Sequence, residues 1–502
     1  MSPDAIAAGL AALFEPMALL CFVIGLGLGL LVGVFPGITI SMAVALATSF
    51  TLTLEPAQGL AMLLAIYVSA QFGDRIPSIL VNTPGTPAAI ATTLDGYPMA
   101  RKGQAGLALS ISAIATTVGI LMSMLVLIFL AQPIAQFALR FGPFEMFALV
   151  VFGLTVIISI SSASLAKGIF AGFLGISLGL IGLDPITGDA RFTFGTYELT
   201  SGLHFIALII GLFGIAEVLD QALTHAEHKV KPITSLGRWW PNRSELKRVA
   251  KPMAQSGLVG AVLGVVPAVG GDIAGLVGWN RAKAISKNPE EFGKGSIEGL
   301  VGSDTASSST LGGAVTTTLS LGIPGDSVMA IMLGSMIIWG IQPGPSLFER
   351  RPDIIVTIVA IMLLATLGAT IVSLIRTKGM TKLLDLKPQL LWGVIVIFCV
   401  VGTYSTTNNV LTVVQMVVFG VIGLFFRRVG IPVAPIVLGF ILGPLAEASL
   451  RRAVLIGHPI ELVTRPISLV LLLLAVGSLF WPVIKRVLDR RRAVKSVDGG
   501  VV

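Results

Sequence analysis

Charged side chains are scarce in this sequence. Only 12% of its 502 residues are Asp, Glu, Lys or Arg, whereas 54% are hydrophobic, and the mean hydropathy is +0.92. Soluble domains carry about twice that share of charge. The composition therefore indicates an integral membrane protein in a lipid bilayer. Its apolar runs have the length of helices that cross the hydrocarbon layer and lack the alternation of a membrane β-barrel, so the predicted class is all-α.

Other absences narrow the function. Cysteine occurs only at Cys21 and Cys399, both within apolar segments, so neither a disulfide framework nor a metal cluster is indicated. The four histidines share no spacing typical of a metal site. The phosphate-binding pattern Gly-x-x-x-x-Gly-Lys-Ser/Thr does not occur, so ATP hydrolysis by such a loop does not drive this chain. We expect an ion gradient as the energy source and no cofactor.

Basic residues lie in short clusters between the apolar runs, which is typical of membrane topology and not of a nucleic-acid-binding surface. The hydrophilic segment 224–252 is rich in Lys and Arg and is therefore predicted to be cytoplasmic. It divides the chain into a first transmembrane repeat (1–223) and a second one (253–447). Residues 448–502 are predicted to form a final transmembrane helix and a basic cytoplasmic tail.

The first fifteen residues contain no Lys or Arg. A cleavable signal peptide begins with basic residues, so we expect the first apolar run to remain as a helix. The basic cluster at 485–495 is predicted to place the C-terminus in the cytoplasm.

Two Pro-Gly pairs interrupt apolar sequence, at Pro84-Gly85 and Pro324-Gly325, and an offset of 240 residues relates them. The same offset pairs Gly73 with Gly313, and the motif Gly-Val-x-Pro occurs at 33–36 and again at 264–267. The sequence therefore predicts an internal repeat. The second Gly-x-x-Pro helix leaves the cytoplasmic linker and the first follows a terminus without basic residues, so we expect an inverted repeat. One miscounted segment would make the repeat parallel.

A Pro-Gly pair breaks a helix, because proline lacks an N–H and glycine admits unusual backbone angles. Bare backbone at membrane depth is tolerated only inside protein or beside water, and paired interruptions in two halves are typical of a transporter's binding site. We therefore predict about 10–12 transmembrane helices and two re-entrant Pro-Gly hairpins, the first within residues 76–94.

Several motifs resemble the large membrane subunit of the tripartite tricarboxylate transporter family. They are GVFPG (33–37), SILVNTPG (78–85), DGYPMARKG (95–103), FGKGSIEG (292–299), LGIPG (321–325) and QPGP (342–345). The resemblance implies a bacterial inner-membrane permease that works with a small membrane subunit and a periplasmic solute-binding protein. Such a permease takes up carboxylates, tricarboxylates or related organic acids, with Na⁺ or H⁺ as the coupling ion. The sequence departs from the family's pattern at residues 72–75 and 303–309.

A carboxylate substrate needs hydrogen-bond donors at membrane depth, and a broken helix offers free N–H groups at a positive dipole end. Arg75 can bind a carboxylate through its planar guanidinium. The predicted substrate-binding residues are Arg75, Asn82, Thr83, Pro84, Gly85, Thr86, Gly325 and Ser327. Acidic residues within membrane segments are costly and usually functional. The predicted ion-coupling residues are Asp272, Asp304 and Asp326.

Simpler interpretations stay open for these residues. The Pro-Gly pairs can merely kink packed helices, Arg75 can form a structural ion pair, and Asp326 can be a simple N-cap. Residues 95–98 (Asp-Gly-Tyr-Pro) are expected to form a turn. For the whole protein the alternative is an intramembrane enzyme acting on an anionic lipid or headgroup. Such enzymes use His, Glu or Asp clusters, whereas the hairpins are mostly Gly, Pro, Ser and Thr, so we expect a transporter and not an enzyme.

Overall fold

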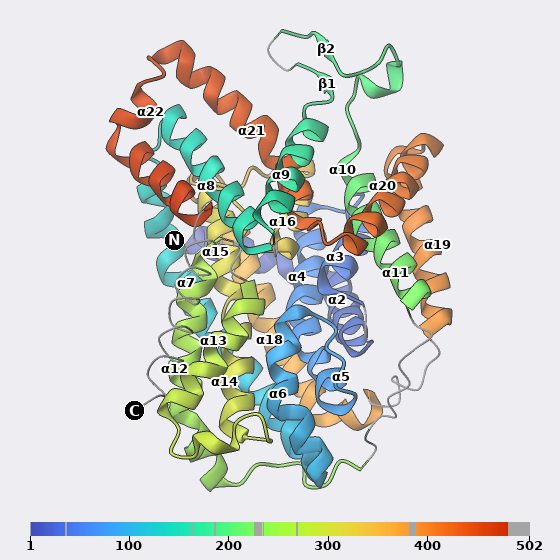
Figure 1. Ribbon diagram of the computed structural model, residues 1–502, viewed down its shortest axis with the longest axis vertical. Coiled ribbons are helices and arrows are strands. Elements are labelled where there is room, and N and C mark those ends of the chain that lie inside the picture. The colour runs from blue at the N-terminus through green and yellow to red at the C-terminus, as the bar shows by residue number, and fades with distance from the viewer. Residues whose placement is uncertain are drawn as a thin grey trace, which may run out of the picture. The chain divides into compact units, whose positions relative to one another are not determined.

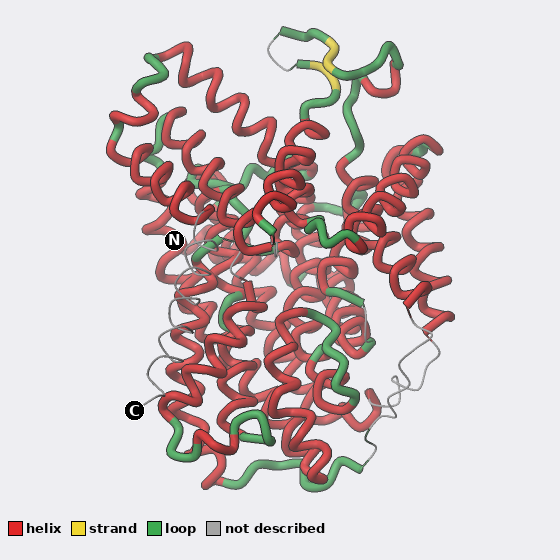
Figure 2. Tube along the Cα trace, in the orientation of Figure 1, coloured by secondary structure: helices red, strands yellow, loops and turns green. Residues whose placement is uncertain are grey.

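The computed structural model describes residues 2–35, 38–161, 164–184, 187–224, 233, 235–267, 270–380 and 388–479. Figure 2 shows these residues as helices and connecting loops, with one short two-stranded ribbon. Among them are six helical segments long and apolar enough to cross a membrane. They are Pro16–Val34, Pro87–Ala138, Phe205–Thr224, Pro352–Ile375, Val410–Arg428 and Ala434–Ile456. The predicted all-α, multi-pass membrane class is confirmed, and the total of 10–12 crossings stays a prediction.

Some predictions concern residues outside the described part of the chain. These are the break at Pro36-Gly37, the linker residues 225–232 with Lys229 and Lys231, part of the final helix, and the basic tail at 485–495. The predicted domain boundaries and the cytoplasmic C-terminus stay predictions.

The chain divides into two compact units, and the first contains residues 1–139 and 204–424. Figure 1 labels most of its helices. They are α1 (Pro3–Leu13), α2 (Pro16–Val34), α3 (Ile40–Thr51), α4 (Pro56–Gly73), α5 (Arg75–Leu80), α6 (Ile90–Met99), α7 (Ala105–Ala138), α10 (Phe205–Ile209), α11 (Ala216–Thr224), α12 (Arg243–Val265), α13 (Gly270–Ile285), α14 (Ile297–Ser308), α15 (Leu311–Leu321), α16 (Ser327–Ile338), α17 (Leu347–Arg350), α18 (Pro352–Met380), α19 (Pro388–Thr407) and α20 (Val410–Arg428), the last of which ends in the second unit.

The second unit contains residues 140–203 and 425–502. Its described elements include α8 (Pro143–Ser161), α9 (Leu165–Gly179), α21 (Ala434–Ile456) and α22 (Glu461–Thr464), and the strands β1 (Gly182–Leu183) and β2 (Ala190–Arg191). The strands pair antiparallel, with Gly182 opposite Arg191. Gly175 lets α9 and α21 approach closely, since a Cβ at this position would lie only 2.1 Å from the Ile436 carbonyl oxygen.

Glycines on one face of α2 let it pack directly on the backbone of α4. Gly25, Gly29 and Gly33 recur every fourth residue, and a Cβ on Gly25 would lie 2.4 Å from the Met62 carbonyl oxygen. Helices inside a bilayer associate through van der Waals contact and gain most where small residues allow close approach. The glycine-rich run in the first apolar segment is explained by this contact.

The helices α12 to α16 follow one another as α2 to α6 do, and one crossing recurs in both series. A Cβ on Gly73 would lie 2.9 Å from the α-carbon of Gly33, and a Cβ on Gly313 would lie 2.3 Å from the carbonyl carbon of Gly264. These four glycines are the ones that the sequence offsets pair. The predicted internal repeat therefore recurs as equivalent contacts, and its inverted orientation stays a prediction.

Both Pro-Gly pairs lie between helices, as predicted. The first separates α5 from the short 3-10 helix η1 (Pro87–Ala89), which leads into α6, and the second separates α15 from α16. At equivalent positions before each pair the backbone is left-handed, with φ 56° at Asn82 and 71° at Gly322. Asn and Gly are the residues that best tolerate this conformation. The two breaks therefore share their backbone geometry.

One local expectation is wrong. Residues 95–98 lie inside α6 and not in a turn, and the chain bends later, at Gly103 (φ 78°). Helix α12 begins at Arg243, within the basic segment 224–252, whose role as a cytoplasmic linker stays a prediction. Asn242 and Glu245 cap each other's backbone there, and the Glu245 carboxylate accepts from the Asn242 N–H at 2.7 Å. This capping box is visible in the sequence and explains why α12 begins at Arg243.

Candidate functional site

The first Pro-Gly break surrounds the carboxylate of Asp74, which lies between α4 and α5. The Gly85 N–H donates to Asp74 Oδ1 at 2.9 Å, and the Thr86 hydroxyl donates to Oδ2. A Cβ on Gly85 would lie 3.0 Å from that Oδ1, so glycine gives the carboxylate room. The N–H group expected to be free for substrate is thus occupied by a carboxylate of the protein. Asp74 was not among the predicted site residues, although its position beside the break was a signal.

Arg75 lies at the start of α5 and is 2% exposed. Its Nη1 donates to Thr92 Oγ1 at 2.9 Å, and its Nη2 donates to Ser307 Oγ at 2.8 Å. The Asp304 carboxylate is 3.6 Å from Nη1. The Nε of Arg75 is buried and has no hydrogen-bond partner among the described residues. A buried guanidinium with an unused donor is ready to receive one more acceptor.

Asp304 is fully buried in α14 and receives hydroxyl donors from two helices of the first half. Thr92 of α6 donates to Oδ1, and Ser112 of α7 donates to Oδ2. Thr92 therefore joins the arginine to the carboxylate. The pair joins the tracts 72–75 and 303–309, at both of which the sequence departs from the family's pattern. Arg75 does form an ion pair, as the simpler interpretation proposed, and it does so with a predicted ion-coupling residue.

The second Pro-Gly break ends at the N-terminus of α16, where Asp326 is the N-cap. Its Oδ1 accepts from the Met329 N–H at 2.8 Å, and its Oδ2 accepts from the hydroxyl of Tyr67, which belongs to α4. The Gly325 N–H donates to Thr318 Oγ1 at 3.3 Å. Asp326 is therefore a cap, but one that a tyrosine from the other half also holds. Nothing in the sequence pattern pointed to Tyr67.

The helix after each break packs against the other half of the chain. In α16, Ser327 and Ser335 lie 2.9 Å and 3.2 Å from the hydroxyls of Ser41 and Thr48 in α3. On the other side, α6 packs on α13, where a Cβ on Gly275 would lie 3.4 Å from the Cβ of Ala91. Each Pro-Gly hairpin therefore packs against helices of the opposite half.

The remaining predicted residues lie at the edges of this region. Asn82 and Thr83 are exposed and Pro84 is half-buried on the first loop. Asp272, near the start of α13, has an exposed side chain, and a Cβ on Gly270 at the same helix start would lie 4.0 Å from the Cβ of Asp326. Among the described residues, no group of three or more His, Cys, Asp or Glu side chains is placed to hold a metal ion.

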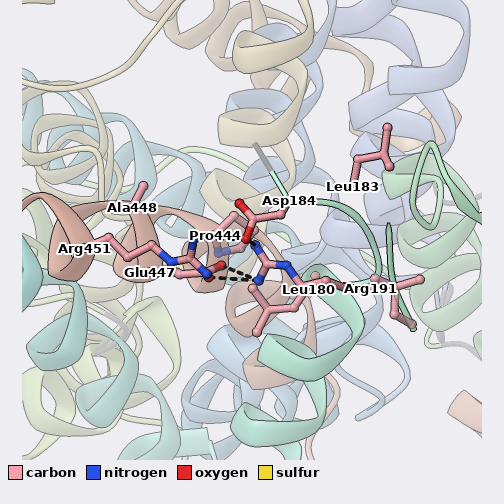
Figure 3. A pocket seen from close by; sticks show the side chains of 10 residues that line it. Leu180, Leu183, Asp184, Arg191, Pro444, Glu447, Ala448 and Arg451 are labelled. Carbon is pink, nitrogen blue, oxygen red and sulfur yellow. Dashed lines mark hydrogen bonds and ion pairs between the residues drawn. The ribbon is translucent and has the colours of Figure 1, made fainter. Parts of the chain in front are cut away.

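A cavity of about 220 Å³ lies in the second unit, apart from the predicted residues. Figure 3 shows Arg191 and Arg451 facing Asp184 and Glu447 across it. Arg191 pairs with Asp184 at 2.6 Å and with Glu447 at 2.8 Å, and Arg451 pairs with the same carboxylates at 3.0 Å and 2.6 Å. The four charges satisfy one another, so this quartet fastens the β1–β2 ribbon to α21.

Comparisons with known proteins agree over most of the chain. A family model described as tripartite tricarboxylate transporter TctA matches residues 19–438. A relative from Agrobacterium vitis, the uncharacterized 52.8 kDa protein in the TAR-I ttuC' 3' region, is 38% identical over 461 residues, which is 91% of each chain. An uncharacterized protein in the TAR-II ttuC' 3' region of the same organism is 37% identical over 241 residues, 48% of this chain and all of the relative. No solved structure matches.

Proposed function

Because the chain belongs to the tripartite tricarboxylate transporter TctA family, we propose that it is the large permease subunit of a binding-protein-dependent secondary transporter. It takes up carboxylates, tricarboxylates or related organic acids, by cation-coupled alternating access. Its partners are a small membrane subunit and a periplasmic solute-binding protein. It resides in the bacterial inner membrane with a cytoplasmic C-terminus.

The observation that carries this proposal is the environment of Arg75. A buried cation beside a helix break, ringed by hydroxyls and with its Nε unused, is suited to an anion. Asp74 supports the same role for the neighbouring backbone, because a carboxylate already fits between Gly85 and Thr86. The substrate carboxylate binds in this first hairpin and competes with the protein's own carboxylates for Arg75 and for these donors.

The second hairpin carries the cation. Asp326 lies at the break, receives the hydroxyl of Tyr67, and is near Asp272 on α13. Two acidic groups that repel each other favour an intervening Na⁺ or a shared proton. Asp304 takes part in the same coupling, since its carboxylate balances the charge of Arg75 until a substrate carboxylate binds. Binding of anion and cation to hairpins that contact opposite halves gives a direct means of coupling them.

Membership of a transporter family points away from the intramembrane enzyme. The deciding experiment is reconstitution of the purified subunits with the binding protein in liposomes. A panel of radiolabelled di- and tricarboxylates is offered with an imposed Na⁺ or H⁺ gradient. Uptake that needs both the gradient and the binding protein is the expected result. Chemical conversion of a lipid or substrate without any gradient would refute the transport function.

A further inference from the structure

Two motifs that the Pro-Gly site does not use meet at the lower end of Figure 1, where α6 approaches α13 and α14. Asp95 of α6 is fully buried, and its Oδ1 accepts from the N–H groups of Gly293 and Gly295 at 2.9 Å and of Ser296 at 2.8 Å. Its Oδ2 accepts from the indole N–H of Trp279 at 2.7 Å. One carboxylate of the first half thus receives four hydrogen bonds from the second.

The loop before α14 is shaped around this carboxylate. Gly293 and Gly295 adopt φ +79° and +104°, which other residues rarely adopt, and this turns neighbouring N–H groups toward one point. A Cβ on Gly299 would lie 2.1 Å from Asp95 Oδ2. The three glycines of this motif therefore serve the contact with Asp95. We call Asp95 with its four donors the latch.

The latch lies beside the basic linker, which the sequence predicts to be cytoplasmic. Lys102 donates to the Lys294 carbonyl at 2.6 Å, and Arg248 pairs with Glu291 at 2.6 Å. The basic linker contacts the first turns of α7, where the Ser110 hydroxyl donates to the Trp239 carbonyl. Lys and Arg are enriched in the cytoplasmic loops of membrane proteins, and the linker between the halves is rich in both, so we assign this end of α6 to the cytoplasm.

The latch and the proposed substrate site share one helix. Thr92, which joins Arg75 to Asp304, precedes Asp95 by three residues, so the two side chains lie on the same face of α6. The second half also covers α6 one residue before Thr92, where Ala91, beside Gly275, is 1% exposed. A movement of α6 away from α13 and α14 would break the latch and uncover this surface together.

We propose that Asp95 is the positioning residue that keeps the substrate site closed to the cytoplasm, and that release of the latch is the inward-opening step. The carboxylate does not touch substrate. It acts by holding α6 against the second half. When α6 moves away from the second half, water must replace the four hydrogen bonds that Asp95 accepts. This inference rests on the proposed function, since it assigns one step of alternating access.

The test is cytoplasmic access to a cysteine under α6. Ala91→Cys is introduced where the native Cys21 and Cys399 are replaced by Ser, and inside-out vesicles are treated with a membrane-impermeant maleimide. Asp95→Asn cannot accept all four hydrogen bonds, so labelling should be at least about tenfold faster than with Asp95 intact. Trp279→Phe keeps an aromatic side chain but removes the indole N–H donor to Asp95, and should give an intermediate labelling rate.

Glu290→Gln is the matched control, because Glu290 is exposed in the same loop and takes no part in the latch; its labelling rate should not change. If Asp95→Asn does not reach the membrane, Trp279→Phe decides the matter. Labelling rates unchanged in the variants that fold would overturn the latch. The assay needs no substrate. Failure of the intact protein to take up any carboxylate would therefore overturn the proposed function without touching the labelling result.

Discussion

Removing Arg75 should destabilise the protein more than removing Arg75 and Asp304 together. Arg75→Ala leaves the Asp304 carboxylate 0% exposed, with only the hydroxyls of Thr92 and Ser112 as donors from the first half. Breaking one side of a buried ion pair costs about 3–5 kcal/mol, because the other charge stays buried and unpaired. In Arg75→Ala/Asp304→Ala that charge is gone. The double variant is more stable than Arg75→Ala only if the coupling energy of the cycle exceeds the cost of Asp304→Ala alone, so we expect a coupling energy larger than about 3–5 kcal/mol.

Thermal unfolding of the two single variants and the double variant in detergent, followed by the fluorescence of the six tryptophans, measures this cycle. The exposed pair Arg238 and Glu245 supplies a matched cycle, for which a coupling of about 0.2–1 kcal/mol is expected. A double variant no more stable than Arg75→Ala would refute the reasoning. Uptake by the same proteins separates the two roles of Arg75. If the arginine binds substrate, the double variant recovers stability and still does not transport.

Three further outcomes follow from the geometry. In the double variant Ala91→Cys/Gly275→Cys the two Cβ atoms lie about 3.4 Å apart, which is close to disulfide geometry. Oxidation should therefore stop uptake, and a reductant should restore it. Either single-cysteine variant should transport under both conditions. Tyr67→Phe removes the hydroxyl from the carboxylate at the second break and should shift the cation concentration for half-maximal uptake by up to about tenfold; an unchanged value would exclude that carboxylate from cation binding. Gly313→Val should lower thermal stability by about 1–3 kcal/mol or more, whereas Gly27→Val, which meets open space, should not.

Features set by local backbone chemistry were predictable from the sequence. The Pro-Gly breaks lie where proline and glycine forbid a regular helix. The offset of 240 residues pairs Asn82 with Gly322, and both are left-handed. The glycine pairs that cross in each half were visible as spacing, because close backbone contact leaves glycine as the residue that fits. Composition alone was enough for the all-α membrane class.

Features set by distant partners were not predictable. Asp95-Gly96 is a strong local turn signal, yet Asp95 lies in a helix because its carboxylate is held by donors about 200 residues later. Asp74 is not among the residues predicted from the sequence, although it occupies the donors expected for substrate. Tyr67 lies in an apolar run without any motif, and only the fold brings it to Asp326. Long-range polar contacts leave little trace in one sequence, since each partner alone is unremarkable.

The partners of Arg75 also bear on how the protein is made. Ser307, which receives one of its hydrogen bonds, is 232 residues further along the chain. At a synthesis rate of about 5–20 residues per second, roughly 10–50 s pass between the two. During that interval the first hairpin carries a cation that the bilayer strongly disfavours and that Asp304 does not yet neutralise. We therefore expect Arg75 to be buried in its final position only after the second half has been inserted.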